Sequence, residues 1–148
     1  MILLNSFKDS DVNILRQYNY SHSQIAEIQN KIHAWNSYES KNKYFELFTI
    51  VYDEKIVGMI TLNQYSDNII SITPVIISSF QKQDIWKKAM LLAFEIAKNK
   101  GYKMVLQETR VTHFSSIALH KSLGFEAGKH SYLNSRGKEV NIFLKILE

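Results

Sequence analysis

Residues 44–77 read YFELFTIVYDEKIVGMITLNQYSDNIISITPVII, and this stretch decides the fold. It is rich in β-branched and aromatic residues, which favour strands. Two polar breaks, at 53–55 and 66–68, divide it into three runs of strand length. Breaks this short join neighbouring strands, so the stretch predicts a three-stranded antiparallel meander. Pro74 lies inside the third run and removes one ladder donor, which predicts a bulge or a splayed pairing near the middle of the sheet.

Helices and further strands are predicted on both sides of the meander, because apolar residues recur there at helical or strand spacing. Before it we expect a strand over 2–7, a helix over 11–18 with Asp9 and Ser10 as candidate caps, and a helix over 24–36. After it we expect a helix from 85 to Gly101, a strand over 103–109, a helix over 115–123 that Gly124 ends, and a hairpin over 130–147 that turns at 134–137. The order β-α-α-β-β-β-α-β-α-β-β is typical of the α+β class, with one right-handed parallel crossover.

The composition fits a single globular domain over residues 1–148, with 45% hydrophobic and 22% charged residues. There is no cysteine, which excludes disulfides and thiolate metal sites and is compatible with a reducing cytoplasm. The opening MILLNSFKD has too few apolar residues for a signal peptide, and no apolar run is long enough to span a membrane. We therefore expect a cytoplasmic domain with no membrane partner.

The net charge of +4 indicates at most a modest preference for anionic partners. The lysines are scattered and the nearest cluster is Lys82, Lys87 and Lys88, which argues for a solvated basic surface and against a nucleic-acid groove. None of the five histidines has a metal-ligand spacing such as H-E-x-x-H, so no metal is expected. No serine lies in a G-x-S-x-G elbow, so a hydrolase triad has no support.

A strand-to-helix junction over Ser78–Met90 reads SSFQKQDIWKKAM. Such junctions bind anions, because the first helical N–H groups lack partners and the macrodipole favours negative charge. They usually carry glycine, which lets the backbone approach a phosphate, but this one has none. Asp84 is predicted to be the N-cap of a helix beginning at Ile85, and to accept from the N–H of Trp86 or Lys87.

These features resemble the GNAT superfamily of acyl-CoA N-acyltransferases from about Phe45 onward. SSIALHKSLGF, residues 115–125, is similar to the family helix that ends in a Leu-Gly-Phe turn. The junction resembles the family loop Q/R-x-x-G-x-G/A at Gln81, with Asp84 and Trp86 at the glycine or small positions. The resemblance implies a mostly antiparallel central sheet of six to seven strands, flanked by helices and splayed at the middle strands.

The resemblance also implies acetyl-CoA as cosubstrate and direct attack by a primary amine on the thioester in a ternary complex. Backbone N–H groups of Ile76 and Ile77, in the splayed strand, would then bind the carbonyl and the pantetheine arm, although their side chains are core under any interpretation. The cofactor-binding residues implied are Ile76, Ile77, Gln81, Lys82, Gln83, Asp84, Ile85, Trp86, Lys87 and His113.

Acyl transfer needs a base for the amine proton and an acid for the leaving thiolate. His120 occupies the position where the family often has a tyrosine acid and other members have histidine, so the resemblance implies that it protonates the thiolate. The alternative is a half-buried histidine that is satisfied by a carbonyl. Glu108, at the end of the strand over 103–109, is the candidate base; the alternative is that it pairs with Arg110 or faces solvent.

Two functions from different classes stay open at this stage. One is an N-acetyltransferase that acts on a small-molecule or peptide amine. In it, lysine side chains would bind the phosphates of the cofactor in place of the backbone of the loop. The other is a non-catalytic binding or regulatory domain whose CoA site is closed by Asp84 and Trp86. The first two helices, which would shape the acceptor side, carry the least resemblance, and the fold is compatible with a homodimer.

Overall fold

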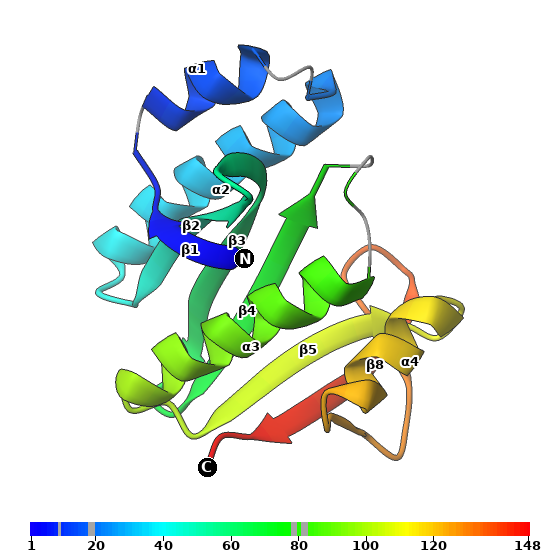
Figure 1. Ribbon diagram of the computed structural model, residues 1–148. Coiled ribbons are helices and arrows are strands. Elements are labelled where there is room, and N and C mark those ends of the chain that lie inside the picture. Colours follow the sequence, from blue (N-terminus) through cyan, green and yellow to red (C-terminus); the bar gives the residue numbers. More distant parts are fainter. Residues whose placement is uncertain (9, 18–19, 78–79, 81–82) are drawn as a thin grey trace.

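The computed structural model describes residues 1–8, 10–17, 20–77, 80 and 83–148, and has twelve helices and strands in this part of the chain (Figure 1). The strands are β1 (Ile2–Ser6), β2 (Phe45–Tyr52), β3 (Lys55–Ser66), β4 (Ile69–Ile76), β5 (Met104–Arg110), β6 (Glu126–Ala127), β7 (Tyr132–Leu133) and β8 (Glu139–Ile146). The helices are α1 (Ser10–Gln17), α2 (His22–Ser40), α3 (Gln83–Asn99) and α4 (Phe114–Ser122).

The described strands form one eight-stranded sheet with the order β1-β2-β3-β4-β5-β8-β6, and β7 pairs β8 off this path. The only parallel pair among the described strands is β4 with β5, which α3 connects as the predicted crossover. The α+β class and the mostly antiparallel sheet are therefore confirmed. The strand count exceeds the predicted number because Glu126–Ala127, just after Gly124, also pairs with β8.

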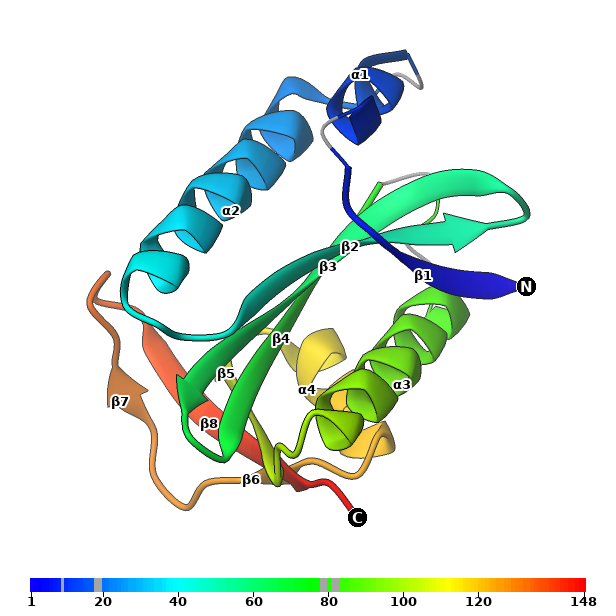
Figure 2. The same cartoon turned by 90° about the vertical axis from the view of Figure 1, so that its left-hand side faces the viewer.

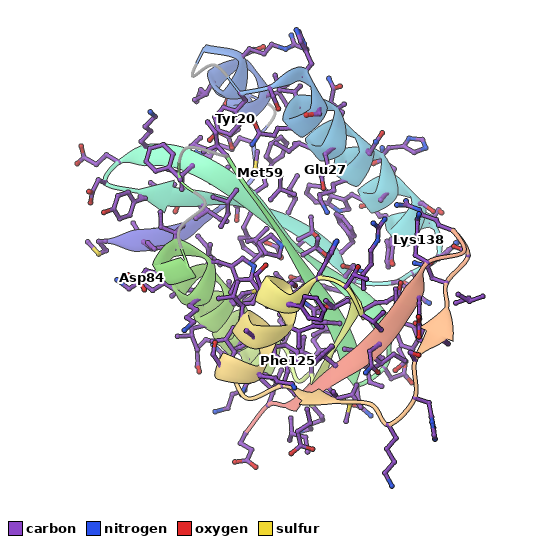
Figure 3. The ribbon with its side chains drawn as sticks, turned by 90° about the vertical axis from the view of Figure 1, so that its right-hand side faces the viewer. Tyr20, Glu27, Met59, Asp84, Phe125 and Lys138 are labelled. Atoms are coloured by element: carbon purple, nitrogen blue, oxygen red, sulfur yellow. The ribbon has the colours of Figure 1, made fainter. Side chains whose placement is uncertain are left out.

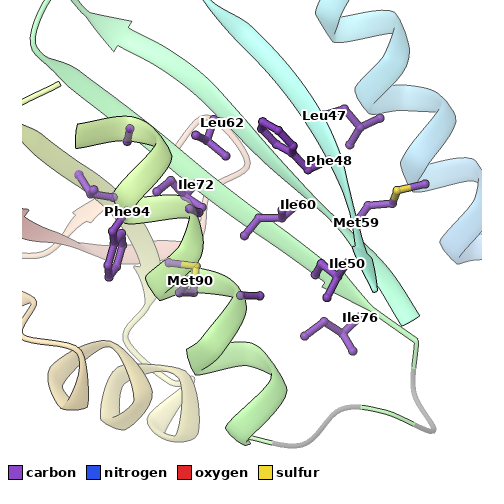
Figure 4. Close-up of a cluster of buried hydrophobic side chains, with 14 of the residues drawn as sticks. Leu47, Phe48, Ile50, Met59, Ile60, Leu62, Ile72, Ile76, Met90 and Phe94 are labelled. Carbon is purple, nitrogen blue, oxygen red and sulfur yellow. The ribbon is translucent and has the colours of Figure 1, made fainter. Parts of the chain in front are cut away.

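Helices cover both faces of the sheet, with α1 and α2 on one face and α3 and α4 on the other (Figure 2). This explains why β3 is buried over six consecutive residues instead of alternating. Leu47 and Met59 lie on the side of α2, and Ile60 lies on the side of α3, where Met90 and Phe94 pack (Figure 4). Among the described residues, no helix has the length and apolar character needed to cross a membrane.

The predicted meander is confirmed, and of the two alternatives for Pro74 the structure shows the splayed pairing and not the bulge. The pairing of β3 with β4 runs without a shift through Ile60 opposite Pro74. The N–H of Ile77 donates to Val57 on β3 at 2.9 Å. The direction of the backbone amide alternates from one residue of a strand to the next, and residue 74 is three positions from residue 77. The amide nitrogen of Pro74 therefore faces β5. Proline is tolerated there because β5 does not pair with that part of β4, and no ladder bond is lost.

The splay lies between β4 and β5, as the resemblance implied. These strands pair only at Ile69 with Met104 and at Ile70 with Val105, and then diverge. β5 continues instead as the partner of β8 along its whole length, from Met104 to Arg110. The sheet is therefore continuous at one end of the β4–β5 pair and open at the other.

Both glycines predicted to end helices do so in Schellman motifs. Gly101 has a φ of 94°, and its N–H donates to Lys98 while that of Tyr102 donates to Ala97. Gly124 has a φ of 89° and repeats the pattern after α4, where the N–H of Phe125 donates to the carbonyl of His120. The Leu-Gly-Phe turn thus brings the ring of Phe125 to 5.1 Å from that of His120.

The helix starts differ from the predicted ones. α3 begins at Gln83, so Asp84 lies inside its first turn and is not the N-cap of a helix that begins at Ile85. A capping residue in the sequence permits a start but does not prevent the helix from extending further toward its N-terminus. α2 begins at His22 because Ser21 and Gln24 form a capping box. Of the two predicted caps of the first helix, Ser10 is instead the first residue of α1, and Asp9 lies outside the described residues.

Candidate active site

A cleft of about 1160 Å³ follows the open end of the β4–β5 pair. Its lining residues are Glu27, Asn63, Ser71, Ile72, Thr73, Pro74, Trp86, Gln107, Glu108, Thr109, Arg110, His113, Ser116, His120, Asn134, Arg136 and Val140. Glu27 comes from α2, on one face of the sheet, whereas Trp86 of α3 and Ser116 of α4 come from the other. The cleft therefore passes through the gap between the strands and borders both faces.

The base of the gap is closed by the side chain of Gln107. Its Nε2 donates to the carbonyl of Ile72, and its Oε1 accepts from the N–H of Ile72 at 3.1 Å. The hydroxyl of Ser71 donates to the carbonyl of Leu106 at 2.8 Å. A buried carboxamide has thus replaced the backbone ladder just beyond the last paired residues, and it satisfies groups that would otherwise be unpaired.

His120 is buried on α4, with 6% of its surface exposed, beside three aromatic rings. The ring centroids of Trp86, Phe125 and Phe143 lie 5.3, 5.1 and 5.7 Å from its own. Its Nδ1 lies 2.7 Å from the carbonyl oxygen of Ser116. A carbonyl can only accept, so Nδ1 carries the proton and, in the neutral ring, Nε2 is left as an acceptor.

Burial lowers the pKa of His120 below its ordinary value, and the bond to the Ser116 carbonyl opposes this only in part. The ring is therefore neutral at neutral pH. The predicted role, protonating a thiolate, requires the charged ring, which this environment disfavours. The alternative considered from the sequence, a histidine satisfied by a carbonyl, agrees with the Nδ1 contact.

Glu108 is exposed at the end of β5 and lines the cleft. Its Oε2 accepts from the hydroxyl of Tyr132 at 2.6 Å, and its Oε1 accepts from Nδ2 of Asn134 at 3.2 Å. The bond from Tyr132 raises the pKa of that phenol to about 12, so Tyr132 stays a donor. Glu108 has no ion pair with Arg110 or any other described residue.

A model of the acetyltransferase (GNAT) family matches residues 11–125 of the sequence. The chain belongs to this family. The match confirms the resemblance and extends it toward the N-terminus, beyond Phe45. A comparison with curated proteins found no significant match.

Solved structures of GNAT enzymes share the fold of this GNAT domain. A chimeric spermidine N-acetyltransferase from Vibrio cholerae has a TM-score of 0.77 at 13% identity, over 99% of this chain and 95% of that one. An acetyltransferase from Salmonella typhimurium that modifies the N-terminal serine of a 50S ribosomal subunit protein has a TM-score of 0.76 at 17% identity, over 99% and 95%. The Vibrio cholerae spermidine N-acetyltransferase in complex with CoA and spermine has a TM-score of 0.72 at 14% identity, over 99% and 95%.

The residues that were expected to bind the cofactor in this GNAT domain are dispersed. Trp86 and His113 line the cleft. Ile76, Ile77 and Ile85 have buried side chains. The carbonyl of Ile76 accepts from Nε2 of Gln24 at 3.4 Å, and the N–H of Ile77 is used by β3.

Asp84 and Lys87, from the same predicted loop, do not line the cleft. Asp84 is exposed in the first turn of α3, and in Figure 3 it lies across the molecule from Glu27 and Lys138. Lys87 is half-buried. Gln81 and Lys82 lie outside the described residues. Gln83 begins α3.

Several residues of the site were not predicted from the sequence. They are Ser71 and Gln107 at the base of the gap, and Tyr132, Asn134 and Arg136 near Glu108. A polar residue inside an apolar strand, such as Gln107 in KMVLQET, was the available signal. The contacts of Glu108 with the hairpin join residues 24 and 26 positions apart, and no local pattern encodes them.

Gln107→Leu is expected to destabilise the GNAT domain by about 1–3 kcal/mol, because it leaves the N–H and carbonyl of Ile72 without partners. The loss should appear in urea unfolding, and the amide of Ile72 should exchange faster with solvent. Gln29→Leu, at an exposed position of α2, is the control and should change neither. Unchanged exchange at Ile72 would show that the side chain does not hold the gap.

Proposed function

We propose that this GNAT domain transfers an acetyl group from acetyl-CoA to a primary amine by direct attack in a ternary complex. The observation that carries the proposal is the cleft, which passes between β4 and β5 and borders both faces of the sheet. Two substrates can enter such a cleft from opposite faces and meet at the gap, so no covalent enzyme intermediate is needed. Holding both reactants in one cleft also supplies the entropic part of catalysis.

The cleft fits an extended acyl-pantetheine arm, because β4 and β5 separate beyond Ile70 and leave room between them. Trp86, His113 and Ser116 would hold the cosubstrate on the side of α3 and α4. Pro74 offers no N–H, and that of Ile72 is used by Gln107. At positions 72 and 74, side chains of the cleft would therefore supply the polar contacts in place of the backbone of β4. Acetyl-CoA supplies the thioester whose C–S bond breaks as the C–N bond forms.

Glu108 is the proposed base that takes the proton of the attacking amine. It lies on the α2 side of the cleft, and its carboxylate oxygens have lone pairs beyond the two bonds that they already accept. Tyr132 and Asn134 fix its orientation. Nε2 of His120 is the proposed second acceptor, on the opposite side of the gap. The proton that the thiolate finally takes comes from solvent or from the amine through these groups.

The proposal predicts that acetyl-CoA raises the melting temperature of the protein, because only the folded state has the cleft. At a concentration 100 times the dissociation constant the gain is about 2.7 kcal/mol, which corresponds to about 5–10 °C for a chain of this size. Thermal unfolding with 1 mM acetyl-CoA measures it, with ATP at the same concentration as the control for a phosphate-bearing nucleotide.

The same experiment separates the enzyme from the non-catalytic alternative. That alternative needs a closed CoA site, but Asp84 is exposed and does not line the cleft, so only Trp86 could close it. No shift with acetyl-CoA, together with no acetylated product by mass spectrometry from any amine, would overturn the proposed function. A shift for acetyl-CoA that ATP does not produce supports it.

A further inference from the structure

Four charged side chains surround the part of the cleft that lies on the α2 side. Glu27 comes from α2, and Arg136 from the turn between β7 and β8. Glu108 and Arg110 come from β5, where they alternate with the buried Gln107 and Thr109. Successive side chains of a strand point to opposite faces, so Glu108 and Arg110 share the face away from α3. This part of the cleft therefore holds two negative and two positive groups.

The two arginines have no carboxylate partner among the described residues. The ion pairs in that part of the chain join the N-terminus to Asp53 and Lys100 to Glu46. Glu108 is two residues from Arg110, but accepts from Tyr132 and Asn134 instead. A guanidinium that has no carboxylate partner and lines a cleft is a bidentate donor for a planar anion.

Arg136 stands on a turn that side-chain bonds hold. Oδ1 of Asn134 accepts from the N–H of Arg136 at 2.9 Å and from that of Lys138 at 3.0 Å. Nδ2 of the same Asn134 donates to Glu108. The loop that carries Arg136 is thus fixed to the proposed base, so the positive group and the base keep a set spacing. Fixed spacing of this kind favours a ligand with its own charges at a set separation.

We propose that the acceptor is a primary amine that also carries a carboxylate. The amine lies toward Glu108 and Glu27, and the carboxylate binds Arg110 and Arg136. This inference rests on the proposed function. Two sources share the chemistry, namely free amino acids and peptide N-termini with an acidic side chain. A polyamine carries only positive charge and would meet two uncompensated arginines.

The test uses purified full-length protein, acetyl-CoA and matched acceptors that differ only in the carboxylate. One arm compares free α-amino acids with their α-carboxamides. A second compares the amidated peptides Asp-Ala-Ala and Asn-Ala-Ala, and a third uses spermidine. We expect kcat/KM to be about 10- to 100-fold higher for the carboxylate member in one of the first two arms, since one charge-assisted bidentate contact distinguishes the pair.

Arg110→Gln and Arg136→Gln should each reduce that ratio toward one, and the corresponding lysine variants should keep part of it. Lys138→Gln is the matched control, because Lys138 is an exposed cation of the same turn that does not line the cleft, and it should keep the full ratio. Equal rates for carboxylate and amide, a preference for spermidine, or an unchanged ratio in both Arg→Gln variants would overturn the inference while leaving the proposed function in place. Failure of the proposed function is separate, because acetyl-CoA would then also fail to raise the melting temperature.

Discussion

Gly58→Ala is expected to destabilise the protein by about 2–4 kcal/mol, which is large for the addition of one methyl group. A Cβ at position 58 of β3 would overlap the carbonyl oxygen of Val75 and lie 3.0 Å from Cα of Ile76. Both are backbone atoms of β4, so the strand itself would have to move. Gly58 pairs with Ile76, at the end of β4 where this strand has separated from β5. The variant should therefore also weaken the stabilisation by acetyl-CoA.

Gly128→Ala provides the comparison, because its Cβ would lie 3.3 Å from Oδ1 of Asn141, a contact that a small shift relieves. We expect Gly128→Ala to lower the free energy of unfolding by less than about 1 kcal/mol. Alanine also restricts the unfolded chain, which by itself would stabilise both variants. Urea unfolding of the two variants measures the difference. If the two variants were equally stable, the backbone of β4 could shift at Val75 with no loss of free energy of unfolding. Gly58 would then not be required for the close approach of β3 and β4.

The elements of this fold were predictable because each has a local signal. The β-branched and aromatic runs, divided by two polar breaks, predicted the meander, and the glycines at 101 and 124 predicted the helix ends. Helix starts were less predictable, because capping residues are common in polar segments. Asp84 was predicted to be a cap on this basis, but α3 begins at Gln83, two residues before the predicted start at Ile85. Tertiary packing stabilises a helix beyond a candidate cap, as long as the next residue of the chain tolerates the helical conformation.

The candidate site was predictable only where one residue had a local context. The family resemblance implied His120, Glu108 followed from its place at a strand end, and both line the cleft. The partners that decide their protonation and orientation come from far along the chain or from backbone. Tyr132 and Asn134 reach Glu108 only because β7 folds back over β8. The bond of Gln107 to Ile72 likewise requires two strands that part at one register position.

His120→Phe is expected to lower kcat/KM by about 100-fold or more, if Nε2 accepts a proton in the reaction as proposed. The variant keeps an aromatic ring among Trp86, Phe125 and Phe143, so the fold should persist. His120→Gln, which retains a hydrogen-bonding group, tests the same atom with less bulk. The stabilisation by acetyl-CoA should change little in either variant, which separates a catalytic loss from a loss of binding. Full activity in both variants would remove His120 from the mechanism.

The pH dependence decides between the two roles of His120. If the neutral ring works as an acceptor, kcat/KM falls as the pH drops through the lowered pKa of His120, below 6.5. If the charged ring donates to the thiolate, kcat/KM rises over the same range.

The pH dependence of the free energy of unfolding is an independent measurement. Above pH 6.5 the ring is neutral in both states. As the pH falls toward the lowered pKa of the folded state, the unfolded chain takes up the proton first, so stability is lost in that range. His120→Phe should reduce this acid-dependent loss of stability. A wild-type rate that rises with acid would instead restore the role implied by the family resemblance. It would require the cosubstrate to raise the pKa of a ring that is neutral in the free protein.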